Sequence, residues 1–217
     1  LRFWLIKRDT PASSKLIILE GISRVKVNTK TLEQYLSTSM NDNDDQVRLK
    51  AWIMLFEAKS KKMNARRLKG AARWMETKHI DVLSQNKKIP SDLFISLALN
   101  ADDDKVRFAS IQVFIDRGEG GAASLKKIEQ ESVEPTVATK ALNAYIALKK
   151  GSDIGFYRKN IEHSADTVRA SALDAIRAYG PKALTQTMRE LIENERAPLP
   201  RVEATRAFVA LSVKPEE

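Results

Sequence analysis

The feature that most constrains this chain is a short pattern that recurs along it. Three copies share an aspartate, a valine two residues later and an arginine directly after the valine, at 45–48, 104–107 and 166–169. A weaker copy surrounds Val137, and a looser one extends from Val202 to Leu211. The first four valines (47, 106, 137 and 168) are separated by 59, 31 and 31 residues, and 59 is close to two periods. Such spacing predicts similar units that pack on their neighbours.

Each of these anchor valines begins a pattern typical of an amphipathic helix. A small residue follows at the fourth position, and apolar residues follow at the fifth, seventh and eighth. Offsets of four, seven and eight share one face at 3.6 residues per turn, so each copy predicts a helix. The aspartate of each copy is expected to cap the helix start. Gly118, Gly151 and Gly180 are expected to end three helices in the left-handed conformation.

A second amphipathic stretch precedes each of the later copies, and it is clearest after Pro181. Two helices that cannot bury their apolar faces alone form one unit of a solenoid. A degenerate unit is expected between Lys59 and Gln85, where the anchor pattern is lost but Leu68, Ala71, Ala72 and Met75 indicate a helix. We therefore predict an all-α, right-handed α-solenoid of about five or six helix-pair repeats. Residues 1–29 are expected to form an N-terminal arm and a capping helix near Ser13–Val25, and residues 30–217 are expected to form a single repeat domain.

The Asp-x-Val-Arg start, followed by small and apolar residues, resembles the second helix of a HEAT-like repeat. The resemblance is to the short type found in phycobilisome-lyase-like and alkylpurine DNA glycosylase proteins, and it covers roughly residues 30–213. It implies a stacked ladder of Asp45, Arg48, Asp104, Arg107, Asp166 and Arg169. The ladder is expected to be interrupted at the Val137 copy, which has Pro135 and Ala138. Because this architecture serves unrelated partners, the resemblance implies a fold more than a function.

Positive charge is concentrated in one segment. Residues 46–88 contain twelve Lys or Arg against three acidic residues, a net charge of +9 that equals the net charge of the whole chain. A localised field of this sign favours a phosphate backbone, an anionic lipid or an acidic protein as partner. A solvated face of an amphipathic helix is the alternative explanation. The candidate basic patch consists of Lys59, Lys61, Lys62, Arg66, Arg67, Lys69 and Arg73.

Two tryptophans accompany the basic patch, Trp52 and Trp74. Trp52 stands at a buried offset of its helix, so it is expected in the core.

The resemblance also implies that second helices line the concave side of the solenoid. Positions three and six residues after each anchor then point into a groove, and the candidate groove residues are Lys50, Ile53, Gln112, Lys140, Asn143, Ser171 and Asp174. This row is mostly small and polar, without a dominant sign of charge. Such a groove suits a peptide or a helix of a protein partner. The aromatic clamp and catalytic carboxylate of the DNA glycosylases are not found among these positions.

Few residues point to catalysis. The chain has no cysteine and two histidines, which excludes a disulfide framework and the usual zinc, haem-thiolate and iron–sulfur sites. His79 and Asp81 supply two metal ligands and no third histidine is near in sequence, so a turn is the better interpretation. The glycines at 118–121 lack the lysine of a phosphate-binding loop. We expect no enzyme activity, no metal and no cofactor.

These observations lead to one main functional hypothesis and two alternatives. The main hypothesis is a non-catalytic protein–protein interaction scaffold, with a protein partner in the groove steered by the basic patch. The first alternative is a DNA- or RNA-binding protein, related to the glycosylases. The second is an adaptor at an anionic membrane, which depends on a segment upstream of Leu1. Apolar runs such as Leu93–Ala98 are far shorter than the roughly 20 residues that span a bilayer. A cytoplasmic location is expected, with the cytosolic domain of a membrane-anchored protein as the other interpretation.

Overall fold

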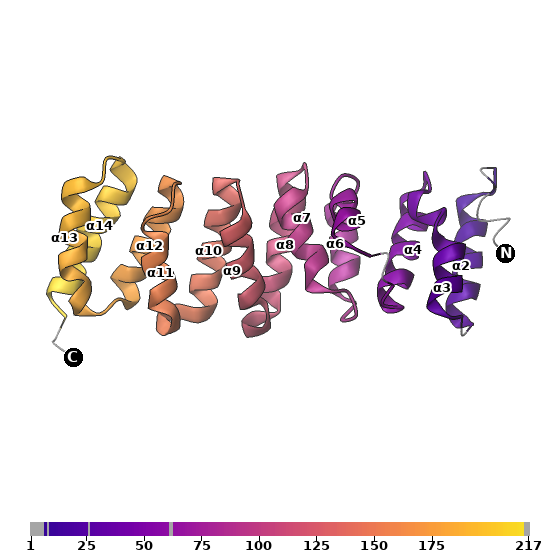
Figure 1. Ribbon diagram of the computed structural model, residues 1–217, viewed down its shortest axis with the longest axis horizontal. Coiled ribbons are helices and arrows are strands. Elements are labelled where there is room, and N and C mark those ends of the chain that lie inside the picture. Colours follow the sequence, from indigo (N-terminus) through magenta and orange to yellow (C-terminus); the bar gives the residue numbers. More distant parts are fainter. Residues whose placement is uncertain (1–6, 8, 26, 61–62, 215–217) are drawn as a thin grey trace. The chain divides into compact units, whose positions relative to one another are not determined.

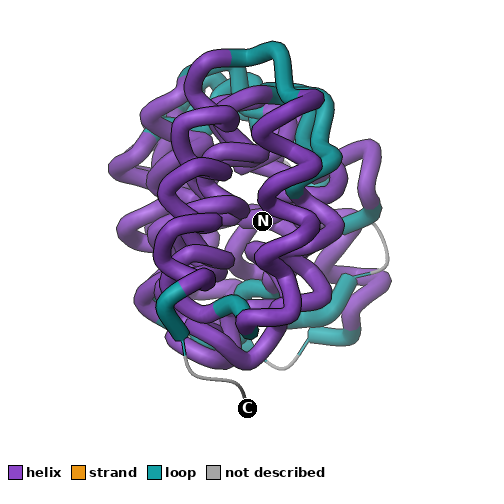
Figure 2. The backbone as a smooth tube through the Cα atoms, turned by 90° about the vertical axis from the view of Figure 1, so that its left-hand side faces the viewer, coloured by secondary structure: helices purple, strands orange, loops and turns teal. Residues whose placement is uncertain are grey.

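The computed structural model describes residues 7, 9–25, 27–60 and 63–214. Within these ranges the chain is helical and contains no strand (Figure 2), which confirms the predicted all-α class. The chain divides into two compact units, Leu1–Val106 (unit 1) and Arg107–Glu217 (unit 2). The boundary expected at residues 29 and 30 and the single domain over 30–217 stay predictions.

Unit 1 consists of short helices joined by tight turns. They are α2 (Ala12–Arg24), α3 (Thr29–Leu36), η1 (Ser39–Asn41), α4 (Asp45–Glu57), α5 (Ala65–Ala71), α6 (Thr77–Ser84) and α7 (Ser91–Asn100). α2 and α3 pack against α4, and α5 packs against α7. The N-terminal helix expected near 13–25 is confirmed as α2. The helix expected from four apolar residues between 68 and 75 is shorter than predicted: α5 ends at Ala71, so Leu68 and Ala71 lie in it, whereas Ala72 and Met75 follow it, and all four side chains are buried.

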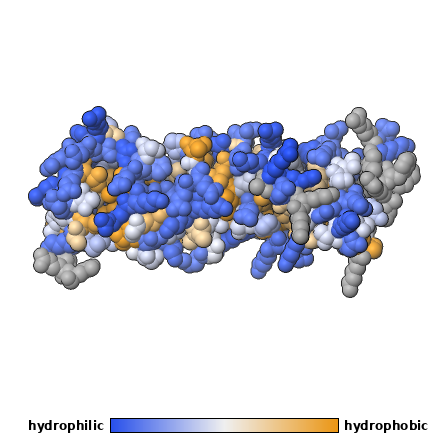
Figure 3. Space-filling view, in the orientation of Figure 1, coloured by the Kyte–Doolittle hydropathy of each residue, from blue (hydrophilic) through white to orange (hydrophobic). Residues whose placement is uncertain are grey.

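Unit 2 continues from α8 (Asp104–Asp116), which begins at the end of unit 1. Its other elements are η2 (Gly118–Gly121), α9 (Ala122–Glu131), α10 (Pro135–Lys149), η3 (Lys150–Asp153), α11 (Ile154–Asn160), α12 (Asp166–Tyr179), η4 (Lys182–Leu184), α13 (Thr185–Asn194) and α14 (Pro198–Ser212). Three helix pairs follow one another, α9 with α10, α11 with α12 and α13 with α14 (Figure 1). The second helices also pack on each other, α10 on α12 and α12 on α14. Hydrophilic residues cover most of the face of unit 2 seen in Figure 3, and hydrophobic residues show between them in places.

The anchor valines hold the core of these helices. Val47, Val106, Val137 and Val168 are at most 2% exposed, as the repeat predicts. Each is the third residue of its helix. In the looser copy Val202 is 47% exposed and is not a buried anchor, whereas Ala207 and Leu211 are buried. The third residue of α14 is Pro200, which is buried, so Pro200 occupies the anchor position there.

The aspartate of the pattern does not cap its helix. In α4 the N-cap is Asp44, whose Oδ1 accepts from the backbone N–H groups of Gln46 and Val47 at 3.0 Å. In α12 the N-cap is Ala165, which has no capping side chain. Asp45 and Asp166 stand one residue further on, inside the first turn, where they pair with the arginine three residues later. The sequence pattern shows a carboxylate near the helix start but does not distinguish these adjacent positions.

The arginine of the pattern ties the preceding loop to its helix. Arg48, Arg169 and Arg201 each donate to the carbonyl oxygen six residues earlier. Arg169 of α12 also pairs with Glu195 at the end of α13, at 2.8 Å, and so joins one helix pair to the next. Arg201 shows that the fifth copy of the motif, in α14, includes Pro200 and Arg201.

Only one of the three expected left-handed glycines has that conformation. Gly118 has φ +58°, whereas Gly180 is extended with φ −68° and ψ 147°. After α10 the left-handed residue is Lys150, with φ 48°, and not Gly151. Gly180 is required for another reason, since a Cβ there would stand 2.6 Å from the carbonyl oxygen of Ile176.

Candidate functional site

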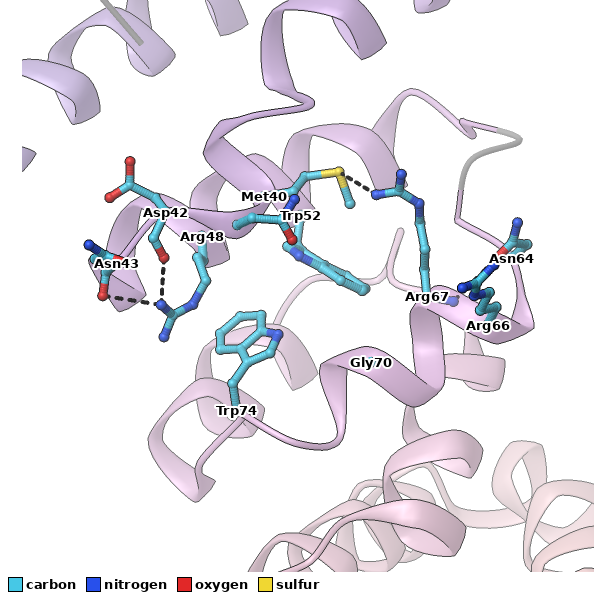
Figure 4. Close-up of a pocket in the computed structure, with 11 residues that line it drawn as sticks. Met40, Asp42, Asn43, Arg48, Trp52, Asn64, Arg66, Arg67, Gly70 and Trp74 are labelled. Carbon is cyan, nitrogen blue, oxygen red and sulfur yellow. Dashed lines mark hydrogen bonds between the residues drawn. The ribbon is translucent and has the colours of Figure 1, made fainter. Parts of the chain in front are cut away.

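Unit 1 contains a pocket of about 740 Å³ that brings part of the basic patch together with the two tryptophans. It is bordered by residues 40–43, by one face of α4, by α5 and by the turn that follows α5. In Figure 4, Arg48 lies at one end of the pocket, Trp52 and Trp74 lie between, and Arg66 and Arg67 lie at the other end. Asn64, at the start of α5, borders the same end.

The two tryptophans meet edge to face. Their ring centroids are 6.1 Å apart and their planes are inclined by 64°. Trp74 also packs edge to face on His79, at 5.4 Å. Trp52 is 4% exposed, which confirms its expected place in the core, yet it also lines the pocket. Its indole Nε1–H finds no acceptor in the part of the chain that the structure describes.

Arg48 is held rigidly at the end of the pocket. Its Nη1 donates to the carbonyl oxygens of Asp42 and Asn43 at 2.5 and 3.1 Å, and its Nη2 pairs with the carboxylate of Asp45. The guanidinium carbon lies 4.8 Å from the centroid of the Trp74 ring, a distance typical of a cation–π contact. The buried Nε–H has no acceptor among the described residues.

Hydrogen-bond donors outnumber acceptors around this pocket. Asp42 is the one acidic residue that lines it, and its carboxylate is occupied by Lys15 at 2.7 Å and by the backbone N–H of Asp44 at 3.1 Å. At the other end, Nη1 of Arg67 meets the thioether sulfur of Met40 at 3.3 Å, and a thioether is a weak acceptor. The pocket therefore favours a ligand that carries negative charge and hydrogen-bond acceptors.

Burial lowers the pKa of His79, the histidine that touches Trp74. Lys78 and Arg48 act in the same direction, and Asp45 and Glu76 oppose them. His79 Nδ1 accepts from the backbone N–H of Glu76 at 2.9 Å, which requires an unprotonated Nδ1. His79 is thus a structural residue that supports the turn beneath Trp74. Among the described residues, no group of three or more acidic or histidine side chains is placed to hold a metal ion.

The basic patch is only partly gathered at the pocket. Arg66 and Arg67 line the pocket, while Lys59, Lys69 and Arg73 are exposed residues of unit 1 that do not line it. Lys61 and Lys62 lie outside the described residues. Arg66, Lys69 and Arg73 form no ion pair with another described residue. Their charge is therefore available to a ligand.

The candidate groove residues divide between the two units. Lys50 and Ile53 are half-buried on α4 in unit 1. The other five belong to second helices of unit 2: Gln112 on α8, Lys140 and Asn143 on α10, and Ser171 and Asp174 on α12. Four of these five are exposed and Ser171 is half-buried.

Several of the five side chains in unit 2 contact neighbouring side chains. Gln112 Nε2 donates to Asp116 at 2.8 Å, and Asp174 pairs with Arg177 one turn later. The Lys140 ammonium lies 4.7 Å from the centre of the Phe108 ring. This surface, which we call the polar row, is regular and solvent-facing but contains no unsatisfied buried donor of the kind that lines the pocket.

Sequence reasoning found the basic patch and the tryptophans but not the pocket. The asparagines at 41, 43 and 64, together with Met40 and Gly70, border the pocket without any signal in the one-dimensional pattern. One sequence signal could have pointed to the pocket. Trp74 follows Arg48 by 26 residues, the same separation as between Arg169 and Glu195, so Trp74 and Glu195 hold equivalent places in their repeats.

A comparison with protein families found no family that matches this chain, and a comparison with curated proteins found no match either.

Proposed function

We propose that this chain is a non-catalytic interaction scaffold, a right-handed solenoid of about five or six HEAT-like repeats that binds a protein partner. Supporting the solenoid are the five buried anchors, each the third residue of its helix, and the packing of successive second helices in unit 2. Such helix pairs bury their apolar faces on their neighbours and leave a repeated surface for a partner.

One observation supports a protein partner most directly. Gln112, Asn143 and Asp174 recur at intervals of 31 residues on three second helices, and all three are exposed. A repeated polar surface of this kind suits a peptide or helix held by a few anchor contacts. The basic patch of unit 1 then accelerates encounter with an acidic partner.

The test is a pair of bulky charged substitutions on the polar row, Gln112→Arg with Asn143→Arg. The matched control is Gln186→Arg with Gln130→Arg, since Gln186 is exposed and bonds the carboxylate four residues later, as Gln112 does. The partner is captured from cells with the unaltered chain and purified, and its Kd is measured by titration. We expect the row pair to weaken binding by about tenfold or more, the equivalent of 1.4 kcal/mol. Equal losses in both pairs, or none in the row pair, would contradict the proposal.

Nucleic-acid binding is the second candidate function, and it is favoured by Arg66, Lys69 and Arg73, which are exposed without ion pairs. Phosphate binding releases counterions, so affinity for a generic duplex would fall with salt at a slope of about −0.9 per phosphate contact. Charge reversal to Glu at these three positions is compared with the same reversal at Lys127, Arg158 and Arg196 of unit 2. Tight duplex binding at about 50 mM salt that only the first set removes would favour this candidate.

The described helices contain no segment with the length and hydropathy needed to cross a bilayer. We place the scaffold in the cytoplasm because the chain contains no cysteine that an oxidising compartment could pair.

A further inference from the structure

We infer that the pocket of unit 1 binds an acidic peptide segment of the partner, in which an apolar or aromatic anchor side chain is flanked by carboxylates. This inference rests on the proposed function as a protein-binding scaffold, and it names the chemistry of the partner at a second place on the chain.

The positive charge that borders the pocket favours a carboxylate, and two buried donors beside it lack an acceptor among the described residues. Trp52 is more than nine-tenths buried and its Nε1–H has no acceptor, and the buried Nε–H of Arg48 has none either. A buried donor without an acceptor destabilises the folded chain. A carboxylate brings oxygen acceptors and a charge opposite to that of Arg66 and Arg67.

The remaining surface of the pocket is suited to an apolar anchor. Met40 and the two indoles supply apolar and aromatic contact. On the opposite border, Gly70 leaves an open space, since a Cβ there would meet no other atom within 4 Å. The volume of about 740 Å³ exceeds the need of a single carboxylate and matches a site that takes a drug-sized ligand or a short segment with its anchor.

The same geometry disfavours a nucleobase. Sequence-tolerant binding of single strands stacks each base on the face of an aromatic ring. The edge-to-face contact between Trp52 and Trp74 leaves no pair of parallel faces between which a base can lie. In addition, the Arg48 guanidinium already covers the Trp74 ring.

The probe is a random copolymer of glutamate and tyrosine, which offers carboxylates and anchors together, and polyglutamate serves as the probe without anchors. Binding is followed by tryptophan fluorescence, because two of the three tryptophans of the chain line the pocket. We expect the copolymer to bind at least tenfold more tightly than polyglutamate and to change the fluorescence.

The decisive variant is Gly70→Leu, which fills the pocket from a helical position where the new side chain meets open space. Gly21→Leu is its matched control, because Gly21 is also a helical glycine of unit 1 with no atom within 4 Å of an added Cβ. We expect G70L to weaken copolymer binding by at least tenfold and G21L to leave it unchanged. Circular dichroism of both variants reports whether the helices are retained.

Three outcomes would overturn the inference. The first is equal affinity of G70L and G21L for the copolymer, and the second is equal affinity of the parent for copolymer and polyglutamate. The third is tighter binding of single-stranded oligothymidine than of the copolymer, with oligothymidine binding lost in G70L. The arginine pair on the polar row, Gln112→Arg with Asn143→Arg, is expected to leave copolymer binding unchanged. Failure of the pocket and failure of the polar row are therefore separate results.

Discussion

Arg48 of unit 1 and Arg169 of unit 2 stand at the same place in the motif but have different surroundings. Both donate to the carbonyl oxygens six and five residues earlier and pair with the aspartate three residues earlier. Twenty-six residues after Arg169 stands Glu195, which accepts from Nε and Nη2 at 2.8 and 3.0 Å. Twenty-six residues after Arg48 stands Trp74, whose ring centroid lies 4.8 Å from the guanidinium carbon of Arg48.

The replacement of a carboxylate by an indole explains why every donor group of Arg169 has an acceptor, whereas Nε of Arg48 has none in the described part of the chain. In unit 2 every donor group of the Arg169 fork has an oxygen acceptor, and the side chain of Glu195 is 11% exposed. In unit 1 an aromatic ring attracts the cation but gives Nε no acceptor, so a donor remains beside the pocket. One local motif therefore supplies stability in unit 2 and a candidate binding site in unit 1.

The largest expected effect is the loss of Arg169. Arg169→Met leaves the nearly buried carboxylate of Glu195 without its counter-ion and is expected to lower the free energy of unfolding by about 3 kcal/mol. Arg48→Met is expected to cost about 1–2 kcal/mol, because its acidic partner Asp45 is 34% exposed and stays solvated. Urea titrations followed by far-UV circular dichroism for R169M and by tryptophan fluorescence for R48M measure both. Equal losses of unfolding free energy would show that the partner 26 residues later, Glu195 or Trp74, makes no difference to stability.

A smaller effect is the coupling between Arg48 and Trp74. A double-mutant cycle with Arg48→Met and Trp74→Leu is expected to give about 1 kcal/mol, the range of a partly desolvated cation–π contact. The parallel cycle with Arg169→Met and Glu195→Gln is expected to give a larger coupling energy. A coupling near zero for the first pair would mean that the two side chains are neighbours without mutual stabilisation.

The smallest effect is a dependence of stability on acid through Glu195, a carboxylate that Trp74 replaces in the Arg48 copy. Hydrogen bonds from Arg169 lower the pKa of Glu195 below its ordinary value of 4.5. The unfolded chain then binds more protons, so this stabilisation is present above about pH 4.5 and is lost as pH falls through the folded pKa. Urea midpoints from pH 6 to pH 3 measure it in the parent and in Glu195→Gln. The variant is expected to show a flatter profile, and parallel profiles would contradict the assignment.

The sequence was most informative about features that depend on neighbouring residues. Period 3.6 identified the helices that begin at Asp45, Asp104, Pro135 and Asp166, and it placed the anchor valines in the core. It was less informative about helix ends. Asp44, and not Asp45, caps α4, and Lys150, and not Gly151, has the left-handed conformation after α10. Adjacent residues of similar chemistry compete for such places, and their selection depends on the packing of the next element.

Periodicity and composition by themselves therefore determined the all-helical class, the anchor positions and the concentration of charge in unit 1, because each follows from local spacing or from counting charges. Only the tertiary structure decided that Trp74 meets Arg48, that Pro200 replaces a valine anchor, and that Arg66 and Arg67 share a pocket with Trp52. These contacts join residues from different helices and turns. Whether a donor finds an acceptor depends on distances and angles between packed helices. The residues of the repeated motif do not determine those distances and angles.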